Sequence, residues 1–254
     1  MDKLSVAIIT LNEERNIGRC LESVQAVADE IVVVDSFSTD DTSEICESYG
    51  VNFSTHPFEG HIEQKNYALS LCAHKHVLAL DADEALSAEL KESILNEKQS
   101  GFKNAYSMNR LTRYCGRWIR HGGWYPDKKI RLVNKEQASW GGTNPHDKLL
   151  THRTIKPIHL EGDLLHYSIN TIDEHIKVVH NFARLGAHAL HKKGEKAPVL
   201  MEYLSPVYKF IQSYFFQLGL VEGKHGWHIA KYSAKSKYLK YKLLRELNQQ
   251  AKTS

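Results

Sequence analysis

The feature that most constrains the fold is the alternation of strand-length apolar runs with helical patterns over the first hundred residues. The apolar runs occupy residues 5–10, 30–35, 51–55 and 76–81, and the segments with helical spacing occupy about 14–27, 40–49, 61–73 and 87–98. Strands that alternate with helices of this length predict βαβ units and a parallel sheet. Because the runs are continuously apolar, we expect helices on both faces of that sheet. The predicted fold class is therefore α/β and Rossmann-like, with a mostly parallel sheet flanked by helices.

The pattern changes from about residue 105. Strands are predicted over residues 105–114 and 129–134, an irregular segment over 139–168, and helices over 171–192 and 198–254. A loop rich in glycine and tryptophan separates the two strands. We predict one domain over residues 1–200, in halves of 1–100 and 101–200, followed by a helical C-terminal tail over 201–254.

Composition indicates an ordinary globular chain. It is 42% hydrophobic and 25% charged, as is usual for globular domains. The first apolar run is too short and too soon followed by charge for a signal peptide, and no stretch approaches the roughly 20 apolar residues that span a bilayer. The four cysteines lie far apart with no CxxC pair, which indicates reduced thiols rather than a zinc site. We expect a cytoplasmic protein.

Charge is distributed unevenly along the chain. The net charge is +3, yet the residues after Pro206 contain nine Lys or Arg and two Glu, interleaved with aromatic residues. A basic aromatic helix can lie on an anionic membrane, here the cytoplasmic face of the inner membrane. The alternative is a helix that packs on the preceding domain and exposes its lysines. No nucleic-acid module accompanies the basic tail, so we do not expect a nucleic-acid partner.

Carboxylates stand at the ends of two predicted strands. Asp81 ends the run over 76–81 and is followed by Asp83, while Asp35 ends the run over 30–35. Ligands of such sheets bind at the carboxyl ends of the strands. The Asp81–Asp83 pair can hold a divalent cation such as Mg²⁺ or Mn²⁺, which bridges phosphate oxygens; a solvated turn that caps the next helix is the alternative. Asp35 can accept hydrogen bonds from a nucleotide base or ribose.

Several other nucleotide-handling classes are disfavoured. No GxGxxG follows the first strand and no GxxxxGK[ST] occurs, which argues against dinucleotide and P-loop enzymes. A phosphatase with an Asp nucleophile also has Asp-x-Asp after a strand. Here, however, three predicted strands precede the motif, and Glu84 and Ala85 follow it in place of a small hydroxylated residue. A nucleotidyltransferase would need a glycine-rich loop with Lys or Arg, which the sequence lacks.

Several motifs, in this order, resemble family 2 glycosyltransferases. The resemblance is strongest over residues 5–17, 31–36 and 80–84, and it continues through 123–127, 131–132, 145–147 and 165–168. Within the family the chain looks most like the lipopolysaccharide core heptose β-1,4-glucosyltransferases. The resemblance implies the GT-A fold, inversion at the anomeric carbon and a divalent cation. It also implies a nucleotide-sugar donor, for which we favour a UDP-sugar. Residues 1–100 would then form the nucleotide-sugar half and residues 101–200 the acceptor half.

The resemblance places most candidate residues in a donor site. The residues implied to contact the nucleotide-sugar are Thr10, Leu11, Glu13, Asp35, Lys65, Asp81 and Arg131. The implied metal ligands are Asp83, Asp81 and His166. Arg131 either pairs with phosphate or supports the catalytic base. An exposed helix lysine is the alternative for Lys65, and a structural histidine is the alternative for His166.

A carboxylate must deprotonate the acceptor hydroxyl on the face opposite the departing nucleotide. The resemblance favours Asp147 for this role, with Asp127 as its competitor. Trp124, Tyr125 and Trp140 can stack on sugar faces or pack in the core. The implied acceptor is a glycolipid or oligosaccharide of the lipopolysaccharide core or a related envelope glycan. The non-enzymatic alternative is a membrane-associated glycan- or nucleotide-binding protein on a transferase scaffold.

Overall fold

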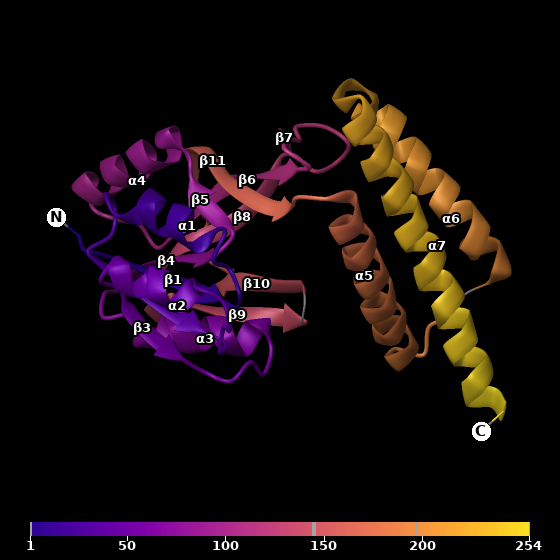
Figure 1. Ribbon diagram of the computed structural model, residues 1–254, viewed down its shortest axis with the longest axis horizontal. Coiled ribbons are helices and arrows are strands. Elements are labelled where there is room, and N and C mark those ends of the chain that lie inside the picture. The colour runs from indigo at the N-terminus through magenta and orange to yellow at the C-terminus, as the bar shows by residue number, and fades with distance from the viewer. Residues whose placement is uncertain (1, 144–145, 197, 254) are drawn as a thin grey trace. The chain divides into compact units, whose positions relative to one another are not determined.

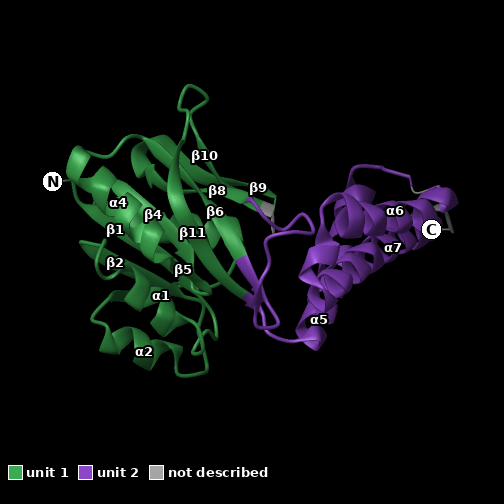
Figure 2. Cartoon of the chain, turned by 90° about the horizontal axis from the view of Figure 1, so that it is seen from above, with its two compact units in different colours: residues 1–111, 127–167 green, residues 112–126, 168–254 purple. Residues whose placement is uncertain are grey.

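A computed structural model describes residues 2–143, 146–196 and 198–253 (Figure 1). The chain divides into two compact units (Figure 2). Unit 1 contains residues 1–111 and 127–167, and unit 2 contains residues 112–126 and 168–254. The predicted domain boundaries at residues 100 and 200 stay predictions.

Most of the described strands belong to one sheet. Nine strands form it, in the order β3-β2-β1-β4-β8-β6-β11-β5 with β7 beside β6, and β9 pairs with β10 in a second sheet. The strands are β1 (Leu4–Thr10), β2 (Glu30–Asp35), β3 (Asn52–Thr55), β4 (His76–Asp81), β5 (Glu84–Leu86), β6 (Ala105–Tyr114), β7 (Arg117–Trp118), β8 (Asp127–Asn134), β9 (Ala138–Thr143), β10 (His146–Thr151) and β11 (Ile158–Ile169).

Parallel pairing is concentrated in the N-terminal part of the sheet. Strand β1 is parallel to both β2 and β4, and β2 is parallel to β3. The pairs β4–β8, β6–β8 and β5–β11 are antiparallel. The predicted fold class, an α/β sheet flanked by helices with a helical C-terminal part, is confirmed, with a mixed sheet.

Helices cover both faces of the sheet in unit 1. They are α1 (Ile17–Val24), α2 (Thr42–Ser48), α3 (His61–Leu71) and α4 (Ala88–Ser100), and the short 3-10 helix η1 (Lys135–Gln137) precedes β9. Alternate residues of β1 point to two cores: Val6 and Ile8 pack with α1, α2 and α4, whereas Ala7 packs with α3, β9 and β10. This two-sided burial explains why the strands are continuously apolar.

The contact between β11 and α4 depends on a glycine. Gly162 adopts φ +91°, and a Cβ there would lie 2.3 Å from the backbone nitrogen of Leu90. Helix α4 begins at this point, where the Ser87 hydroxyl accepts a hydrogen bond from the Leu90 N–H at 3.2 Å. The glycine therefore allows the helix start to approach the strand, and Leu90 reaches the core.

The prediction of an irregular segment over residues 139–168 is wrong. This segment contains most of β9, all of β10 and nearly all of β11. Strand β9 is fixed by a contact remote in sequence, because the Asn66 side chain exchanges hydrogen bonds of 3.0 and 2.9 Å with the Trp140 backbone. The short strand β5 was also not predicted, and it pairs with β11. Such long-range pairings leave no local pattern in the sequence.

Unit 2 is built mainly from helices. They are α5 (Ile172–Lys192), α6 (Val199–Ile211), the π-helical turn η2 (Gln212–Phe216), the 3-10 turn η3 (Gly219–Glu222) and α7 (Lys224–Thr253). The predicted helices over 171–192 and 198–254 are thus confirmed. Thr171 and Glu174 form a capping box at the start of α5. Among the described residues, no helix combines the length and apolarity needed to cross a membrane.

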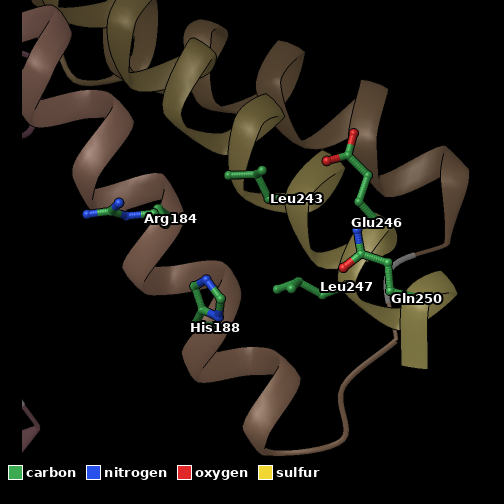
Figure 3. A pocket seen from close by; sticks show the side chains of 6 residues that line it. All are labelled: Arg184, His188, Leu243, Glu246, Leu247 and Gln250. Atoms are coloured by element: carbon green, nitrogen blue, oxygen red, sulfur yellow. The ribbon is translucent and has the colours of Figure 1, made fainter. Parts of the chain in front are cut away.

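Helices α5 and α7 leave a small hollow of about 190 Å³ between them (Figure 3). It is lined by Arg184 and His188 from α5 and by Leu243, Glu246, Leu247 and Gln250 from α7. None of the residues predicted for the donor site or the base lines this hollow.

Candidate active site

The ends of three neighbouring parallel strands bring the first candidate residues together. In the sheet register Thr10 pairs with Asp35, and Ile9 pairs with Asp81. Thr10 therefore ends the strand between those of the two carboxylates. The sequence-based expectation that Asp35 and Asp81 share one edge of the sheet is confirmed.

Asp81 lies between two cationic side chains. Its carboxylate oxygens are 2.8 Å from Nζ of Lys65 and 3.1 Å from a guanidinium nitrogen of Arg131. Burial alone would raise the pKa of Asp81, but the charges of Lys65 and Arg131 outweigh burial and hold that pKa well below its usual range. Asp81 is therefore ionised at neutral pH.

Lys65 joins Asp81 to a second carboxylate. Its ammonium nitrogen is also 2.8 Å from Oδ2 of Asp147 on β10 and 4.4 Å from the centre of the Trp140 ring. Lys65 projects from α3 and is only 6% exposed. The exposed-lysine alternative is thus wrong, because the side chain is buried among acidic and aromatic partners. Trp140 is buried here as well.

Arg131 links Asp81 to a buried glutamate that was not assigned a role from the sequence. The Arg131 guanidinium lies 2.7 Å from Glu84 Oε1, and the other Glu84 oxygen accepts the Asp81 N–H at 3.1 Å. Burial would lower the pKa of Arg131, but the Glu84 and Asp81 carboxylates raise it above the usual range. Glu84 thus fixes Arg131 against Asp81.

Asp127 lies at the other end of this ion-pair network. Arg110 contacts Glu84 at 3.7 Å and Asp127 at 2.8 Å, and Lys129 approaches Asp127 at 3.0 Å. Arg110 belongs to no recognisable sequence motif, so it was not predicted as a site residue. Asp127 is therefore connected to the Asp81 carboxylate through three side chains, Arg110, Glu84 and Arg131, whereas Asp147 is connected to it through Lys65 alone.

Asp83 pairs with His166 across the β5–β11 strands. His166 Nε2 lies 3.2 Å from Oδ2 of Asp83, and the Asp83 carbonyl accepts the Tyr167 N–H at 2.8 Å. Within the described ranges, no group of three or more His, Cys, Asp or Glu side chains could hold a metal ion. Of the three predicted metal ligands, Asp83 and His166 lie in contact with each other, whereas Asp81 contacts Lys65 and Arg131; their role as ligands stays a prediction.

The loops after β1 and β2 are joined by hydrogen bonds. Asn12 N–H donates to Ser38 Oγ at 2.8 Å, and Thr39 N–H donates to the Asn12 side-chain oxygen at 2.8 Å. Asp35 is 2% exposed and accepts from both the N–H, at 2.7 Å, and the hydroxyl of Ser38. Asp35 thus shapes the loop beside the strand ends. Asn12 and Ser38 were not assigned roles from the sequence.

The remaining residues of the predicted nucleotide pocket lie around these loops. Thr10 is buried, and its hydroxyl has no hydrogen-bond partner among the described residues. Leu11 is 47% exposed. Burial raises the pKa of Glu13; the hydrogen bond from Asn16 opposes this effect, and the Asp83 charge adds to it. The Thr10 hydroxyl is thus an unsatisfied polar group that is closed off from solvent.

Two of the proposed sugar-stacking residues belong to unit 2. Trp124 packs edge-on against Tyr114 and His175 in the core of that unit, and Arg120 lies over the Tyr125 ring at 5.1 Å. Residues 145–147 form one of the motifs that resemble family 2 glycosyltransferases. Pro145 in this motif lies outside the described residues.

Residues 5–155 match the family described as Glycosyl transferase family 2. The chain belongs to glycosyl transferase family 2. Membership of this family confirms the predicted enzyme class, an inverting glycosyltransferase that uses a nucleotide-sugar donor.

The family relatives match the chain over most of its length. An uncharacterised glycosyltransferase of Rickettsia typhi is 32% identical over 259 residues, which cover 98% of this chain and 88% of that protein. The lipopolysaccharide core biosynthesis glycosyltransferase LpsC of Rhizobium meliloti is 28% identical over 223 residues, covering 84% of this chain and 80% of LpsC. The narrower resemblance to heptose β-1,4-glucosyltransferases stays a prediction.

The solved structures match this chain over smaller shares of their lengths than the sequence relatives do. A glucosyl-3-phosphoglycerate synthase from Mycobacterium tuberculosis, in complex with Mn²⁺, UDP and glucosyl-3-phosphoglycerate, has a TM-score of 0.37 and 22% identity, with 44% of each chain covered. TarS of S. aureus has a TM-score of 0.41 and 18% identity over 71% of this chain and 39% of TarS. The matched region thus spans less than half of either solved chain.

Proposed function

We propose that this family 2 enzyme transfers a hexose from a UDP-sugar to a hydroxyl group of a lipopolysaccharide-core or related envelope glycan. The observation that carries the proposal is the Lys65 ammonium, 2.8 Å from both Asp81 and Asp147. It joins a carboxylate at the strand ends, where donors bind in such sheets, to a candidate base. The similarity to LpsC, 28% identical, supports the acceptor class.

In this proposal the nucleotide occupies the loops after β1 and β2. Asp35, held by Ser38, accepts hydrogen bonds from the base or ribose, and Thr10 lies beside it at the strand end. Leu11 and Glu13 line the same pocket. Lys65 and Arg131 offset the negative charge of Asp81 beside the strand ends, and both are donors of the kind that bind phosphate oxygens.

The Asp83–His166 pair fits the chemistry of a divalent cation. Oδ2 of Asp83 and Nε2 of His166 lie 3.2 Å apart, so both side chains could hold the same ion, for which the carboxylate would be the harder ligand. When bound, the ion would offset negative charge on the leaving diphosphate.

Asp147 acts as the general base in this scheme. An inverting transfer requires the acceptor oxygen to attack the anomeric carbon opposite the diphosphate while a carboxylate removes the hydroxyl proton. The salt bridge to Lys65 orients the Asp147 carboxylate, and its side chain retains 12% exposure. Asp127 is the competitor, but its contacts are with Arg110 and Lys129 rather than with Lys65.

Thermal unfolding in the presence of nucleotides tests the donor site. A ligand that binds the native state alone raises the melting temperature Tm. We expect UDP or a UDP-sugar with Mn²⁺ or Mg²⁺ to raise Tm, and the metal-dependent part of this shift to disappear in Asp83→Ala. The matched control Glu92→Ala changes an exposed acidic residue of α4 and should retain the full shift. A folded wild-type protein whose Tm responds to no nucleotide would contradict the proposed donor site and support a membrane-associated protein that binds glycan without catalysis.

A further inference from the structure

Helix α6 has its apolar side chains on the outside. Its one buried residue is Glu202, which is 2% exposed and receives the Arg245 Nε–H of α7 at 2.9 Å. The apolar residues of α6 with 39–65% exposure are Val199, Leu200, Met201, Tyr203, Leu204, Val207, Tyr208 and Ile211. A surface helix in water normally buries its apolar stripe. In α6 the apolar side chains are exposed and the charged Glu202 is buried.

The same inversion continues beyond α6. Between the start of η2 and the first turn of α7 the exposed apolar residues are Phe215, Phe216, Leu218, Leu220, Val221 and Trp227, with Phe216 at 78% exposure. The buried residues of η2 and η3 are Ser213, Gly219 and Glu222. We call the exposed apolar residues from Val199 to Trp227 the outer face of unit 2. It contains fourteen of the twenty-three large apolar side chains that are exposed in the described part of the chain.

Buried polar contacts fix the orientation of this segment. Glu222 accepts hydrogen bonds from Arg117 at 2.9 Å and from the Arg120 N–H at 3.0 Å, and it lies 2.8 Å from Nδ1 of His121. The Ser213 hydroxyl donates to the Gly122 carbonyl at 2.8 Å. Rotating the segment to bury its apolar side chains would break these bonds and leave buried polar groups without partners. The outer face is therefore held outward by the fold.

The charge of the neighbouring helix α7, which packs on α6, favours one kind of partner. After Trp227 the chain has seven Lys or Arg and one Glu, so an apolar surface with negatively charged groups above it is complementary. A second copy of the chain would bring an equally basic tail and repel the first. Trp227, which packs edge-on against Phe210 and Tyr214, is of the residue type enriched at the boundary between lipid and water.

We propose that the outer face of unit 2 inserts into the headgroup region of an anionic lipid bilayer, with α6 parallel to the membrane surface. No described helix meets the requirements for a membrane span, so the contact is interfacial. Burial of the outer face supplies apolar contact, and the lysines of the tail supply attraction to anionic lipid. The proposal concerns attachment alone and does not depend on the sugar-transfer reaction.

Vesicle flotation tests the proposal without nucleotide or sugar. Wild-type protein should float with vesicles of three parts phosphatidylethanolamine to one part phosphatidylglycerol, and bind them at least about tenfold more strongly than phosphatidylcholine vesicles. Leu200→Glu/Tyr208→Glu/Phe216→Glu should reduce binding at least about tenfold. The matched control Phe58→Glu/Leu71→Glu changes exposed apolar residues of unit 1 and should bind as the wild type does.

A second measurement uses the folded wild-type protein, so it does not depend on the stability of the charged variant. Lipids brominated in their acyl chains should quench tryptophan fluorescence, and Trp227→Phe should remove this quenching. Absence of wild-type flotation, equal flotation of the triple variant, or quenching that survives Trp227→Phe would overturn the proposal. So would light scattering that shows a wild-type dimer which the triple variant does not form.

Discussion

The ammonium group of Lys65 lies 2.8 Å from the carboxylate of Asp147, 82 positions away in the chain. The same nitrogen lies 2.8 Å from Asp81 at the end of β4. One buried cation therefore holds a strand-end carboxylate and the proposed base in a single arrangement. Donor binding and proton removal, in this account, depend on the placement of one side chain of α3.

Replacing Lys65 should affect both folding and activity. Lys65→Met leaves Asp81 and Asp147 without the cation between them. We expect the free energy of unfolding to fall by about 2–4 kcal/mol, since breaking a buried ion pair leaves unpaired charge. Transfer activity should be lost. Denaturant unfolding measures the first effect. Lys148→Met, at the exposed neighbour of Asp147, is the control, and an equal loss of stability there would contradict the specific role of Lys65.

Gly162→Ala should be far more destabilising than Gly116→Ala. Both glycines have positive φ, +91° and +88°, but only Gly162 faces backbone atoms, whereas Gly116 has nothing within 4 Å of a built Cβ. The shared backbone effect costs about 1 kcal/mol. The clash with Leu90 should add about 2 kcal/mol or more. Equal losses in chemical unfolding of the two variants would show that α4 can move away from β11.

Phe37 combines a left-handed backbone with an exposed ring beside Asp35. Its φ is +64°, and the residue is 57% exposed. We expect Phe37→Gly to leave stability unchanged or to raise it by up to about 1 kcal/mol, because glycine relieves the strain of this backbone conformation. We also expect UDP binding to weaken several-fold, because a ring that can stack on the base is lost. Calorimetric titration with UDP measures this, and unchanged affinity would exclude the ring as a contact. Phe37→Trp should retain wild-type affinity.

Unit 2 should lose stability in mild acid through His175. Burial, with a smaller contribution from the charge of His228, lowers the pKa of His175 to about 4. The unfolded chain binds this proton near pH 6.5. The contribution to stability is therefore fully present above pH 6.5 and is lost as pH falls from 6.5 to about 4, by an amount on the order of 2 kcal/mol.

Denaturant unfolding at pH 7 and pH 5 measures this effect. His175→Gln should reduce the difference in unfolding free energy between the two pH values. His61→Gln, at an exposed histidine, should leave the difference as it is in the wild type. A difference that persists in His175→Gln would assign the acid sensitivity to another group.

Local patterns were enough to predict the parallel part of the fold. The strands that end at Asp35 and Asp81 have the predicted bounds, because continuous apolarity marks a strand buried on both faces. The shared edge of the two carboxylates followed from parallel topology. Residue types alone therefore indicated the part of the candidate site that contains Asp35 and Asp81.

Long-range contacts could not be predicted in the same way. Nothing near Lys65 in the sequence points to Asp147, and Glu84 gains its role only when Arg131 and Arg110 fold against it. Strands β9 and β10 contain polar and glycine residues and depend on pairing and on Asn66. The tail was recognised as basic and aromatic, but its outward apolar face depends on the burial of Glu202 and Glu222, which only packing determines.

The most direct test of the central claim is turnover of UDP-glucose with a heptose-terminated core oligosaccharide, in Asp147→Asn beside Asp127→Asn. We expect Asp147→Asn to lower the rate of acceptor-dependent UDP release by about 10²–10⁴-fold, while the UDP-induced rise in Tm persists. Asp127→Asn should lower the rate by less than about tenfold. An Asp147→Asn enzyme that turns over at the wild-type rate, or a large loss confined to Asp127→Asn, would show that Asp147 is not the base.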